Sequence, residues 1–231
     1  AYYAERLRRS GVQIKLNSAP KDEDLKDFNE VVVATGIDPR RPDIPGIEHR
    51  KVASYVDVLT GRASVGDEVA IIGMGGIGFD VALYLLERGS RAPLDADAFA
   101  AHWGISSQGE LKEMPANPPA HRITMLKRSH TPFGHTLGRT TGWVHRAELA
   151  RNGVKMLKGV EYRRIDDEGL HIQVDGKDAV VKADTIIVCA GQVPRRNGAR
   201  PHFHVIGGAK EAAELDAKRA MLEGAELGAR L

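Results

Sequence analysis

The stretch Val69-Ala70-Ile71-Ile72-Gly73-Met74-Gly75-Gly76-Ile77-Gly78 decides the fold of this chain. A short apolar run of β type enters a glycine turn, and an apolar-periodic stretch over residues 77–88 leaves it. Gly73, Gly75 and Gly78 have the G-x-G-x-x-G spacing of a dinucleotide-binding βαβ turn. The stretch therefore predicts a Rossmann-type unit, and a purely structural glycine turn in an α/β protein is the alternative.

Each glycine of this turn has a physical role in such a unit. Gly73 permits the tight turn, Gly75 lets the backbone approach a pyrophosphate, and Gly78 lets the helix pack on its strand. Backbone N–H groups and the positive end of the helix dipole then face the diphosphate. The predicted nucleotide contacts are Gly73, Met74, Gly75, Gly76, Ile77 and Gly78.

Composition is typical of a globular protein and excludes several functional classes. The 231 residues are 42% hydrophobic and 28% charged, which allows one large domain or two small ones. A scattered net charge of +2 argues against a nucleic-acid partner, and no apolar run approaches the roughly 20 residues of a membrane span. We also find no signal peptide at the start.

The single cysteine, Cys189, excludes an intrachain disulfide and a Cys-x-x-Cys redox pair within this chain. This argues against a thioredoxin-reductase-like activity, and a reducing, cytoplasmic setting is the simplest expectation. The nine histidines lack metal-ligand spacing, so we assign no metal.

The segments before the glycine turn suggest the middle of a domain and not its beginning. Residues 1–10 are typical of the end of a helix, residues 12–16 alternate as a strand does, and residues 30–36 form a buried-type strand with a small-residue end. Residues 37–50, rich in proline and charge, predict a stiff linker. Because a domain rarely begins on the last turns of a helix, we expect a fragment of something longer.

The segments after the turn interrupt the expected βαβ rhythm and then resume it. A helix over about 77–88 is followed by a small amphipathic helix from Asp95 to Trp103. A strand over 122–126, a helix over about 143–152 and a strand over 154–157 come next.

The last part of the chain changes character. Residues 159–181 predict short antiparallel strands, with turns at 166–169 and 175–177. Residues 185–191 form a second strand with a small-residue end, and a helix over 212–231 closes the chain. Two such strand ends, at Gly36 and Gly191, bracket the nucleotide unit, which is the pattern of one dinucleotide domain inserted into another.

The choice of nucleotide depends on the end of the second strand of the unit. Asp95 and Asp97 lie near the position of an NAD-type acid, about 20 residues past the glycines. No strand leads into them, so we expect Asp95 to act as a helix N-cap or first-turn acid instead. The displaced second strand ends at Leu126 and continues into Lys127, Arg128 and Ser129.

Two adjacent cations at that strand end suit a 2′-phosphate, since charge-assisted contacts contribute roughly 1.5–3 kcal/mol each. Lys127, Arg128 and Ser129 therefore predict NADP(H) rather than NAD(H). The alternative is that Lys127 and Arg128 form a solvated pair at the strand end.

Several blocks in register resemble the C-terminal half of bacterial NADPH-dependent 2,4-dienoyl-CoA reductases, flavoproteins related to old yellow enzyme. The resemblance covers essentially the whole chain. The matching blocks are residues 53–59, 69–80, 103–105, 137–146, 165–171, 206–208 and 214–220.

The resemblance implies an α/β fold in which a Rossmann-like NADP(H) domain is inserted in a partial FAD domain, as in glutathione-reductase-like proteins. It implies a first FAD-type part over residues 1–54, the inserted domain over 55–190 and the last FAD-type part over 191–231. In the family, hydride passes from NADPH to FAD, and electrons continue through a 4Fe-4S cluster to FMN, which reduces the dienoyl-CoA. The cluster, FMN and substrate sites belong to an N-terminal catalytic barrel that is absent here and is the implied partner.

The resemblance also implies flavin-side residues. Thr35, Gly36, Ala190, Gly191 and Gln192 are strand-end positions close to the flavin or the domain hinge, with plain linkers as the alternative. Gly207 and Gly208 precede a helix where the parent fold contacts the FAD diphosphate or ribitol. Many related flavoproteins carry aspartate at the second of these positions.

Two departures from the family weaken the flavin site. The first glycine motif of the FAD domain should lie upstream of Ala1, and the basic loop over residues 195–203 is shorter than in the family. We therefore expect the isolated chain to bind NADP(H), to purify without flavin and to have no reductase activity. We assign no catalytic residue, because hydride transfer needs only orientation and exclusion of water.

Two other functions remain open. One alternative is the largely structural nucleotide domain of a related amine dehydrogenase, against which Lys127 and Arg128 argue. The other is a stand-alone nucleotide-binding module without catalysis.

Overall fold

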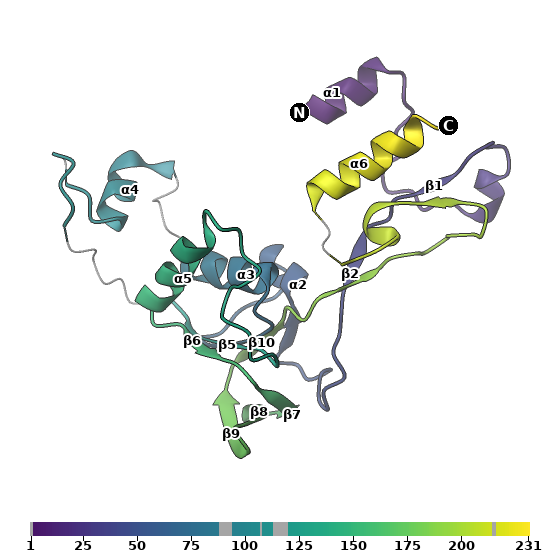
Figure 1. Ribbon diagram of the computed structural model, residues 1–231. Helices are drawn as coiled ribbons and strands as arrows, with labels where there is room; N and C mark the ends of the chain where they lie inside the picture. Colours follow the sequence, from purple (N-terminus) through teal and green to yellow (C-terminus); the bar gives the residue numbers. More distant parts are fainter. Residues whose placement is uncertain (1, 88–93, 107, 113–119, 214–215) are drawn as a thin grey trace. The chain divides into compact units, whose positions relative to one another are not determined.

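The computed structural model describes residues 2–87, 94–106, 108–112, 120–213 and 216–231 (Figure 1). The chain divides into two compact units. The terminal unit consists of Ala1–Asp38 and Val193–Leu231, and the central unit of Pro39–Gln192. The first boundary thus lies earlier than the predicted end of the FAD-type segment at Ser54, because residues 39–54 pack with the central unit.

A five-stranded parallel sheet forms the middle of the central unit, in the order β3-β10-β4-β5-β6. Its strands are β3 (Val52–Ser54), β10 (Thr185–Val188), β4 (Glu68–Ile72), β5 (Arg122–Leu126) and β6 (Lys155–Leu157). The strands β4 and β10 are near-continuous apolar runs, as expected where both faces of a parallel sheet are covered. The predicted α/β fold with a Rossmann-like unit is confirmed.

Three helices cover one face of this sheet (Figure 1): α2 (Tyr55–Leu59), α3 (Gly76–Glu87) and α5 (Gly142–Arg151). The helix α3 leaves the glycine turn after β4, as predicted, and its Phe79 and Leu85 are fully buried against the sheet. Burial of such a side chain contributes roughly 1.5–3 kcal/mol, so this layer fixes the position of the turn.

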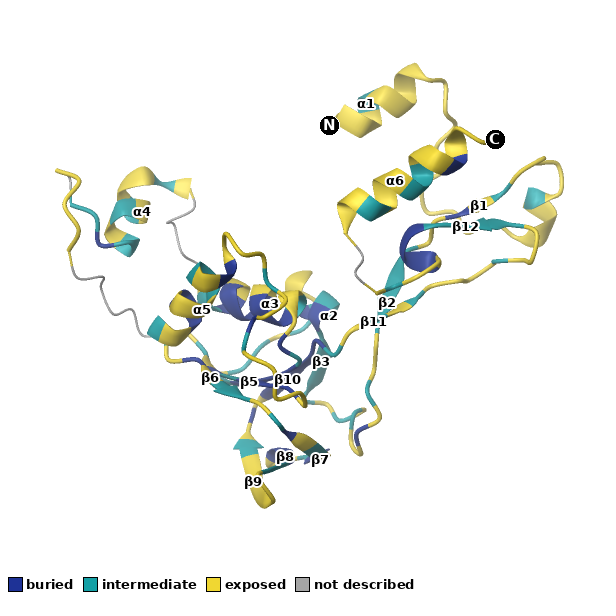
Figure 2. Ribbon diagram, viewed as in Figure 1, coloured by how far each residue is buried: buried dark blue, intermediate teal, exposed yellow. Residues whose placement is uncertain are grey.

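A three-stranded antiparallel sheet lies on the other face (Figure 2). It consists of β7 (Glu161–Asp166), β8 (Gly169–Val174) and β9 (Lys177–Lys182). Its Leu170 and Ile172 are buried in a second apolar cluster that includes residues of β4 and β10. The turns between these strands fall where the sequence places them.

The terminal unit contains much less regular structure. Its elements are α1 (Tyr2–Arg9), η1 (Asp22–Leu25), β1 (Val32–Val33), β12 (His204–Val205), η3 (Gly207–Ala209) and α6 (Ala217–Gly228). The strands β1 and β12 pair in parallel, and β2 (Ile37–Pro39) pairs with β11 (Gln192–Pro194) where the chain passes between the units. The helix α1 has no buried residue (Figure 2).

Residues 12–16, predicted as a strand, form none in the structure. The alternating pattern requires a neighbouring strand and a covered face, and Val12, Ile14 and Leu16 are exposed instead. Among the described residues no helix is long and apolar enough to cross a bilayer.

The interruption after α3 contains the predicted small helix, α4 (Ala96–His102). Its N-cap is Asp95, whose carboxylate accepts the N–H of Ala98 at 2.8 Å. The prediction that Asp95 caps a helix is therefore confirmed. The sequence predicts Gly89 as the cap of the helix over about 77–88, and this position lies outside the described residues.

Candidate nucleotide-binding site

Two glycines of the turn after β4 are required by backbone packing. Gly73 has φ +111°, and a Cβ there would lie 2.2 Å from the carbonyl oxygen of Cys189. A Cβ on Gly78 would lie 2.2 Å from the carbonyl oxygen of Gly73. The N–H of Gly73 donates to Leu126 O at 2.8 Å, so the turn is joined to both neighbouring strands, β10 and β5.

The middle of the turn, in contrast, faces open space. A Cβ built on Gly75 or Gly76 has no heavy atom within 4 Å. Both residues border a cavity of about 960 Å³ at the N-terminus of the twelve-residue helix α3. The cavity is lined by residues 40–44, 72–77, 127–130, 159–162 and 189–191. Its size and position at a helix N-terminus fit a dinucleotide with a diphosphate on the turn.

Strand β5 brings the predicted cations to this cavity. It pairs with β4 in parallel, with Leu126 opposite Ile72, so the strand takes the place of the second strand of a βαβ unit. Lys127, Arg128 and Ser129 follow directly and line the same cavity as Gly73–Ile77.

Lys127 is already occupied by internal hydrogen bonds. The residue is 8% exposed, and its ammonium donates to Thr131 O, to Thr131 Oγ1 at 3.0 Å and to Pro132 O at 3.0 Å. Burial, and next the charge of Lys158, lower the pKa of Lys127. An ammonium with three acceptors has used its three donors, so Lys127 has none left for a phosphate.

Arg128 is exposed and lines the cavity. Within the part of the chain that the structure describes, its guanidinium makes no hydrogen bond or ion pair. The other two arginines that line the cavity have partners: Arg40 donates to Ala190 O at 2.7 Å, and Arg41 pairs with Glu48. Arg128 is therefore the cavity-lining guanidinium whose five donors remain open to a ligand.

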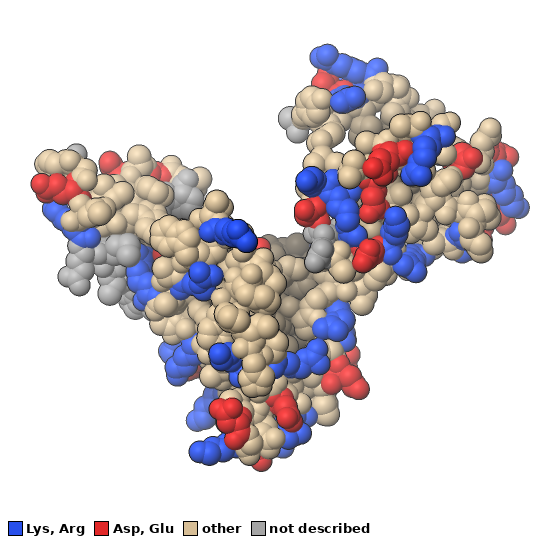
Figure 3. All heavy atoms as spheres, in the orientation of Figure 1, with Lys and Arg blue, Asp and Glu red and all other residues tan. Residues whose placement is uncertain are grey.

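The cavity lining carries both signs of charge, with Asp43 and Glu161 beside the cations. On the face shown in Figure 3, Lys and Arg side chains are interspersed with Asp and Glu. Charge selection at the cavity is therefore a local property of a few cations and not of a broad basic surface.

The sequence missed one wall of the cavity. Residues 40–44, predicted as part of a stiff linker, line it together with the glycine turn, and Ile44 is buried. Arg40 fixes this wall: its N–H donates to Gly191 O at 3.0 Å, and its Nε donates to Ala190 O. The sequence signal was the pair of arginines before Pro42, which a plain linker does not need.

The flavin-side predictions fall in both units. Ala190 and Gly191 lie in the central unit and line the same cavity as the glycine turn. Gln192 donates from Nε2 to the hydroxyl of Tyr55 at 3.3 Å. In the terminal unit, Thr35 Oγ1 donates to Arg195 O, and Gly36 has φ +79° with open space around it.

Gly207 and Gly208 are buried in the terminal unit. The N–H of Gly207 donates to the carboxylate of Glu223 at 2.8 Å, so this backbone group is already satisfied. Arg219 Nε is buried without a partner among the described residues. The described residues of the terminal unit contain no glycine turn like the one after β4.

Cys189 follows β10 and lines the cavity. Burial raises the pKa of its thiol to about 12. The thiol therefore stays protonated at neutral pH and does not act as a redox nucleophile.

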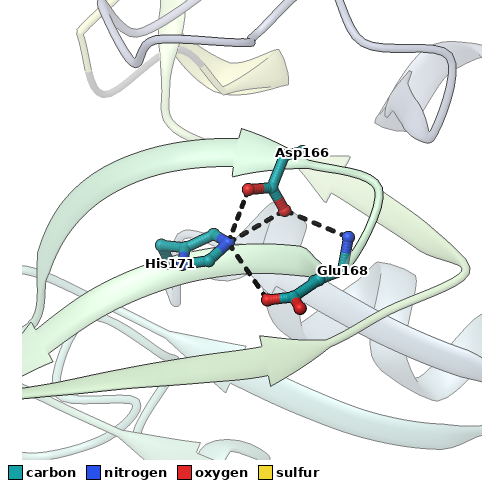
Figure 4. Close-up of side chains that lie close together, drawn as sticks. All are labelled: Asp166, Glu168 and His171. Atoms are coloured by element: carbon teal, nitrogen blue, oxygen red, sulfur yellow. Dashed lines mark hydrogen bonds and ion pairs between the residues drawn. The ribbon is translucent and has the colours of Figure 1, made fainter.

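The structure also brings together three possible metal ligands that the sequence did not indicate. The ligand atoms of Asp166, Glu168 and His171, on the β7–β8 hairpin, lie within 4.8 Å of one another (Figure 4). His171 Nε2 lies 2.8 Å from Asp166 and 3.9 Å from Glu168. The sequence signal was an acidic turn flanked by Asp166 and His171. The hairpin pairs Asp166 with Gly169 and Arg164 with His171, and the side chains of Asp166 and His171 then meet in a hydrogen bond.

The donors around Asp166 fit a hairpin brace better than a metal site. Its carboxylate accepts the N–H of Glu168 at 3.0 Å and Nε of Arg164 at 3.1 Å, in addition to His171. Arg164 also lies 3.4 Å from His171 Nε2, so a metal ion there would face a guanidinium. The His171 hydrogen bond holds the pKa of Asp166 at about 2.

Comparison with known proteins agrees with this geometry. A family described as pyridine nucleotide-disulphide oxidoreductase matches residues 10–211. A metal reductase of Desulforamulus reducens is 31% identical over 82% of this chain and 29% of its own length. A cinnamate reductase of Clostridium sporogenes is 26% identical over 85% of this chain and 25% of its own length.

Solved structures show the same fold. The structure of 2-naphthoyl-CoA reductase with 2-naphthoyl-CoA matches with a TM-score of 0.77 and 23% identity, over all of this chain and 31% of that chain. The bacillithiol disulfide reductase of Bacillus cereus matches with a TM-score of 0.64 and 18% identity, over all of this chain and 76% of that chain. The chain thus spans less than a third of the length of the two curated relatives described above.

Proposed function

Because the chain belongs to the pyridine nucleotide-disulphide oxidoreductase family, whose members bind FAD and NAD(P)H, we propose that it is the NADPH-binding, electron-input part of a flavoprotein reductase similar to 2,4-dienoyl-CoA reductases. One observation carries the proposal: a single cavity of the central unit joins an open glycine turn to an unpaired arginine at the end of the adjacent strand.

The residues of this chain have separate tasks in that function. Gly75 and Gly76 leave room for a diphosphate to approach backbone N–H groups at the start of α3. Arg128 supplies a guanidinium suited to a 2′-phosphate. The nucleotide, when bound, supplies the hydride, and the walls of the cavity orient it and exclude water.

The wider role depends on polypeptide outside this chain. The terminal unit exposes many apolar side chains, and contiguous exposed apolar surface marks interaction sites. They are Tyr2, Tyr3, Leu7, Val12, Ile14, Leu16, Phe28, Val32, Val193, Met221, Leu222 and Leu231. We propose that a catalytic barrel of the same protein, carrying FMN and a 4Fe-4S cluster, and the rest of the FAD domain cover this surface.

Nucleotide titration tests the function directly. Calorimetry with the full chain is expected to show tighter binding of NADPH than of NADH. Gly75→Val is expected to abolish binding with little loss of stability, because the branched side chain enters space that is empty without ligand.

Gly224→Val is the matched control. Gly224 lies in α6, and a Cβ there also meets nothing within 4 Å. Valine is a better helix former than glycine, so this variant should fold and bind NADPH as the wild type does. Equal affinity of the wild type and Gly75→Val would show that the turn is structural only.

A further inference from the structure

The two adjacent cations after β5 differ in almost every physical respect. Lys127 is buried and Arg128 is exposed. Successive residues at the end of a strand point to opposite sides, so one side chain enters the protein and the next leaves it. The pair that the sequence presents as one basic site is therefore two separate groups.

The buried ammonium of Lys127 joins the strand end to the loop that follows. All three of its acceptors belong to Thr131 and Pro132, and its Nζ also lies 5.4 Å from the ring centroid of Phe133. A charge removed from water is costly unless it is fully hydrogen-bonded, so the loop can leave this position only by exposing or unpairing the ammonium.

The loop that Lys127 holds forms the immediate surroundings of Arg128. Ser129 Oγ is hydrogen-bonded to Thr131 Oγ1 at 2.9 Å. His130 packs on Gly159, where a Cβ would lie 2.3 Å from the imidazole. Arg128 is thus followed by two residues with fixed positions, although its own guanidinium is free of partners among the described residues.

We propose that Lys127 is a positioning residue: it holds the strand end from which Arg128 reaches the 2′-phosphate, and so raises the preference for NADPH over NADH without touching the phosphate itself. The inference rests on the proposed nucleotide function. It assigns the orientation of Arg128 to the buried ammonium of the preceding residue, which ties the strand end to Thr131 and Pro132.

A double-mutant cycle on the full chain tests this division. Dissociation constants for NADPH and NADH are measured by calorimetry for the wild type, Arg128→Ala, Lys127→Met and the double variant. Arg128→Ala should weaken NADPH binding about tenfold or more and change NADH binding less than about twofold, since a charged contact to the extra phosphate is lost.

Lys127→Met should weaken NADPH binding about three- to tenfold, again with little effect on NADH. The double variant should be no weaker than Arg128→Ala alone, because a positioning residue has nothing left to position. Additive losses would show that Lys127 contacts the phosphate itself and would overturn the proposal. An unchanged NADPH/NADH ratio in Lys127→Met would overturn it as well.

Two further variants keep the test decisive. Thr131→Val removes one acceptor of Lys127 and leaves the lysine in place, so it should lower the NADPH/NADH preference even if Lys127→Met does not fold. Lys158→Met is the matched control, since Lys158 also lies near the Phe133 ring, at 5.9 Å, but is exposed. It should change the preference less than about twofold.

The outcomes also separate this proposal from the proposed function. A wild-type chain that binds neither nucleotide would contradict the function itself. A wild type that prefers NADPH, together with a Thr131→Val variant of unchanged preference, would contradict only the role given to Lys127.

Discussion

The central unit and the terminal unit come from the same chain but differ in how much of their apolar side chains they bury. The central unit buries two clusters, one on each face of a five-stranded sheet. The terminal unit pairs two strands of two residues each, and the buried apolar side chains among its described residues are Val33, Ala209 and Leu227. Its Leu16 remains 81% exposed.

This difference indicates that a glycine motif can bind a nucleotide only where a packed core fixes the position of its backbone. The glycine turn after β4 is fixed by β10, β5 and α3, so its open glycines have a defined position. Gly207 and Gly208 have no comparable sheet beneath them among the described residues, and the N–H of Gly207 is satisfied internally. We therefore expect this chain to bind NADPH through its central unit on its own, and to bind FAD through its terminal unit only weakly.

The largest expected effect comes from breaking the packing of the turn itself. Gly73→Ala should destabilise the central unit by about 3 kcal/mol or more, because a positive φ and a close backbone contact act together. Both tryptophans, Trp103 and Trp143, lie in this unit, so urea unfolding followed by tryptophan fluorescence reports its stability.

Gly61→Ala is the control for backbone strain alone. Gly61 has φ +71° in the same unit, but a Cβ there meets nothing within 4 Å. Its expected cost is about 1 kcal/mol. Equal losses in the two variants would show that the contact between Gly73 and Cys189 O contributes nothing.

The next effect concerns the terminal unit. The purified chain is expected to bind NADPH and to carry little or no flavin, because the described residues of that unit provide no glycine turn for a second diphosphate. The visible absorbance spectrum of the purified protein, with protein concentration measured separately, checks this. A flavin content near one per chain would show that the terminal unit holds FAD without further polypeptide.

The sequence predicted those parts whose patterns are local. β5 was predicted with its observed bounds, and α3 and the β7–β8–β9 hairpins within one or two residues, because apolar periodicity and turn residues determine them. The strand over residues 12–16 failed because alternation does not create a partner strand.

The candidate site was predicted unevenly for the same reason. The glycine turn and the strand end at Lys127 follow from local motifs, and β-sheet register brings them together. The wall at Arg40 and the internal bonds of Lys127 depend on contacts that no local pattern encodes. Burial decides that Arg128, and not Lys127, is free to contact a ligand. Only the structure shows this burial.

The smallest expected effect concerns the hairpin brace of the central unit. Asp166 has a pKa lowered to about 2, chiefly by the hydrogen bond with His171, so the folded state favours its charged form. Its stabilisation is therefore present above the ordinary carboxyl pKa of about 3.9 and is lost as pH falls toward 2. Asp166→Asn, which resembles the protonated acid, should be less stable than the wild type at pH 6.

The difference between the two proteins should shrink as the pH is lowered from about 4 toward 2, and urea midpoints followed by tryptophan fluorescence measure it. Asp175→Asn is the matched control, because Asp175 lies in the next turn of the same sheet, at φ +50°, a conformation that asparagine also adopts. Its carboxylate has no hydrogen bond among the described residues, so its difference from the wild type should not show this pH dependence.

A difference for Asp166→Asn that stays constant from pH 6 to the acid limit would mean that the brace does not depend on the charge of Asp166. Unchanged NADPH affinity in Asp166→Asn at pH 7 would separate this brace from the nucleotide cavity, whose described lining includes neither Asp166 nor His171.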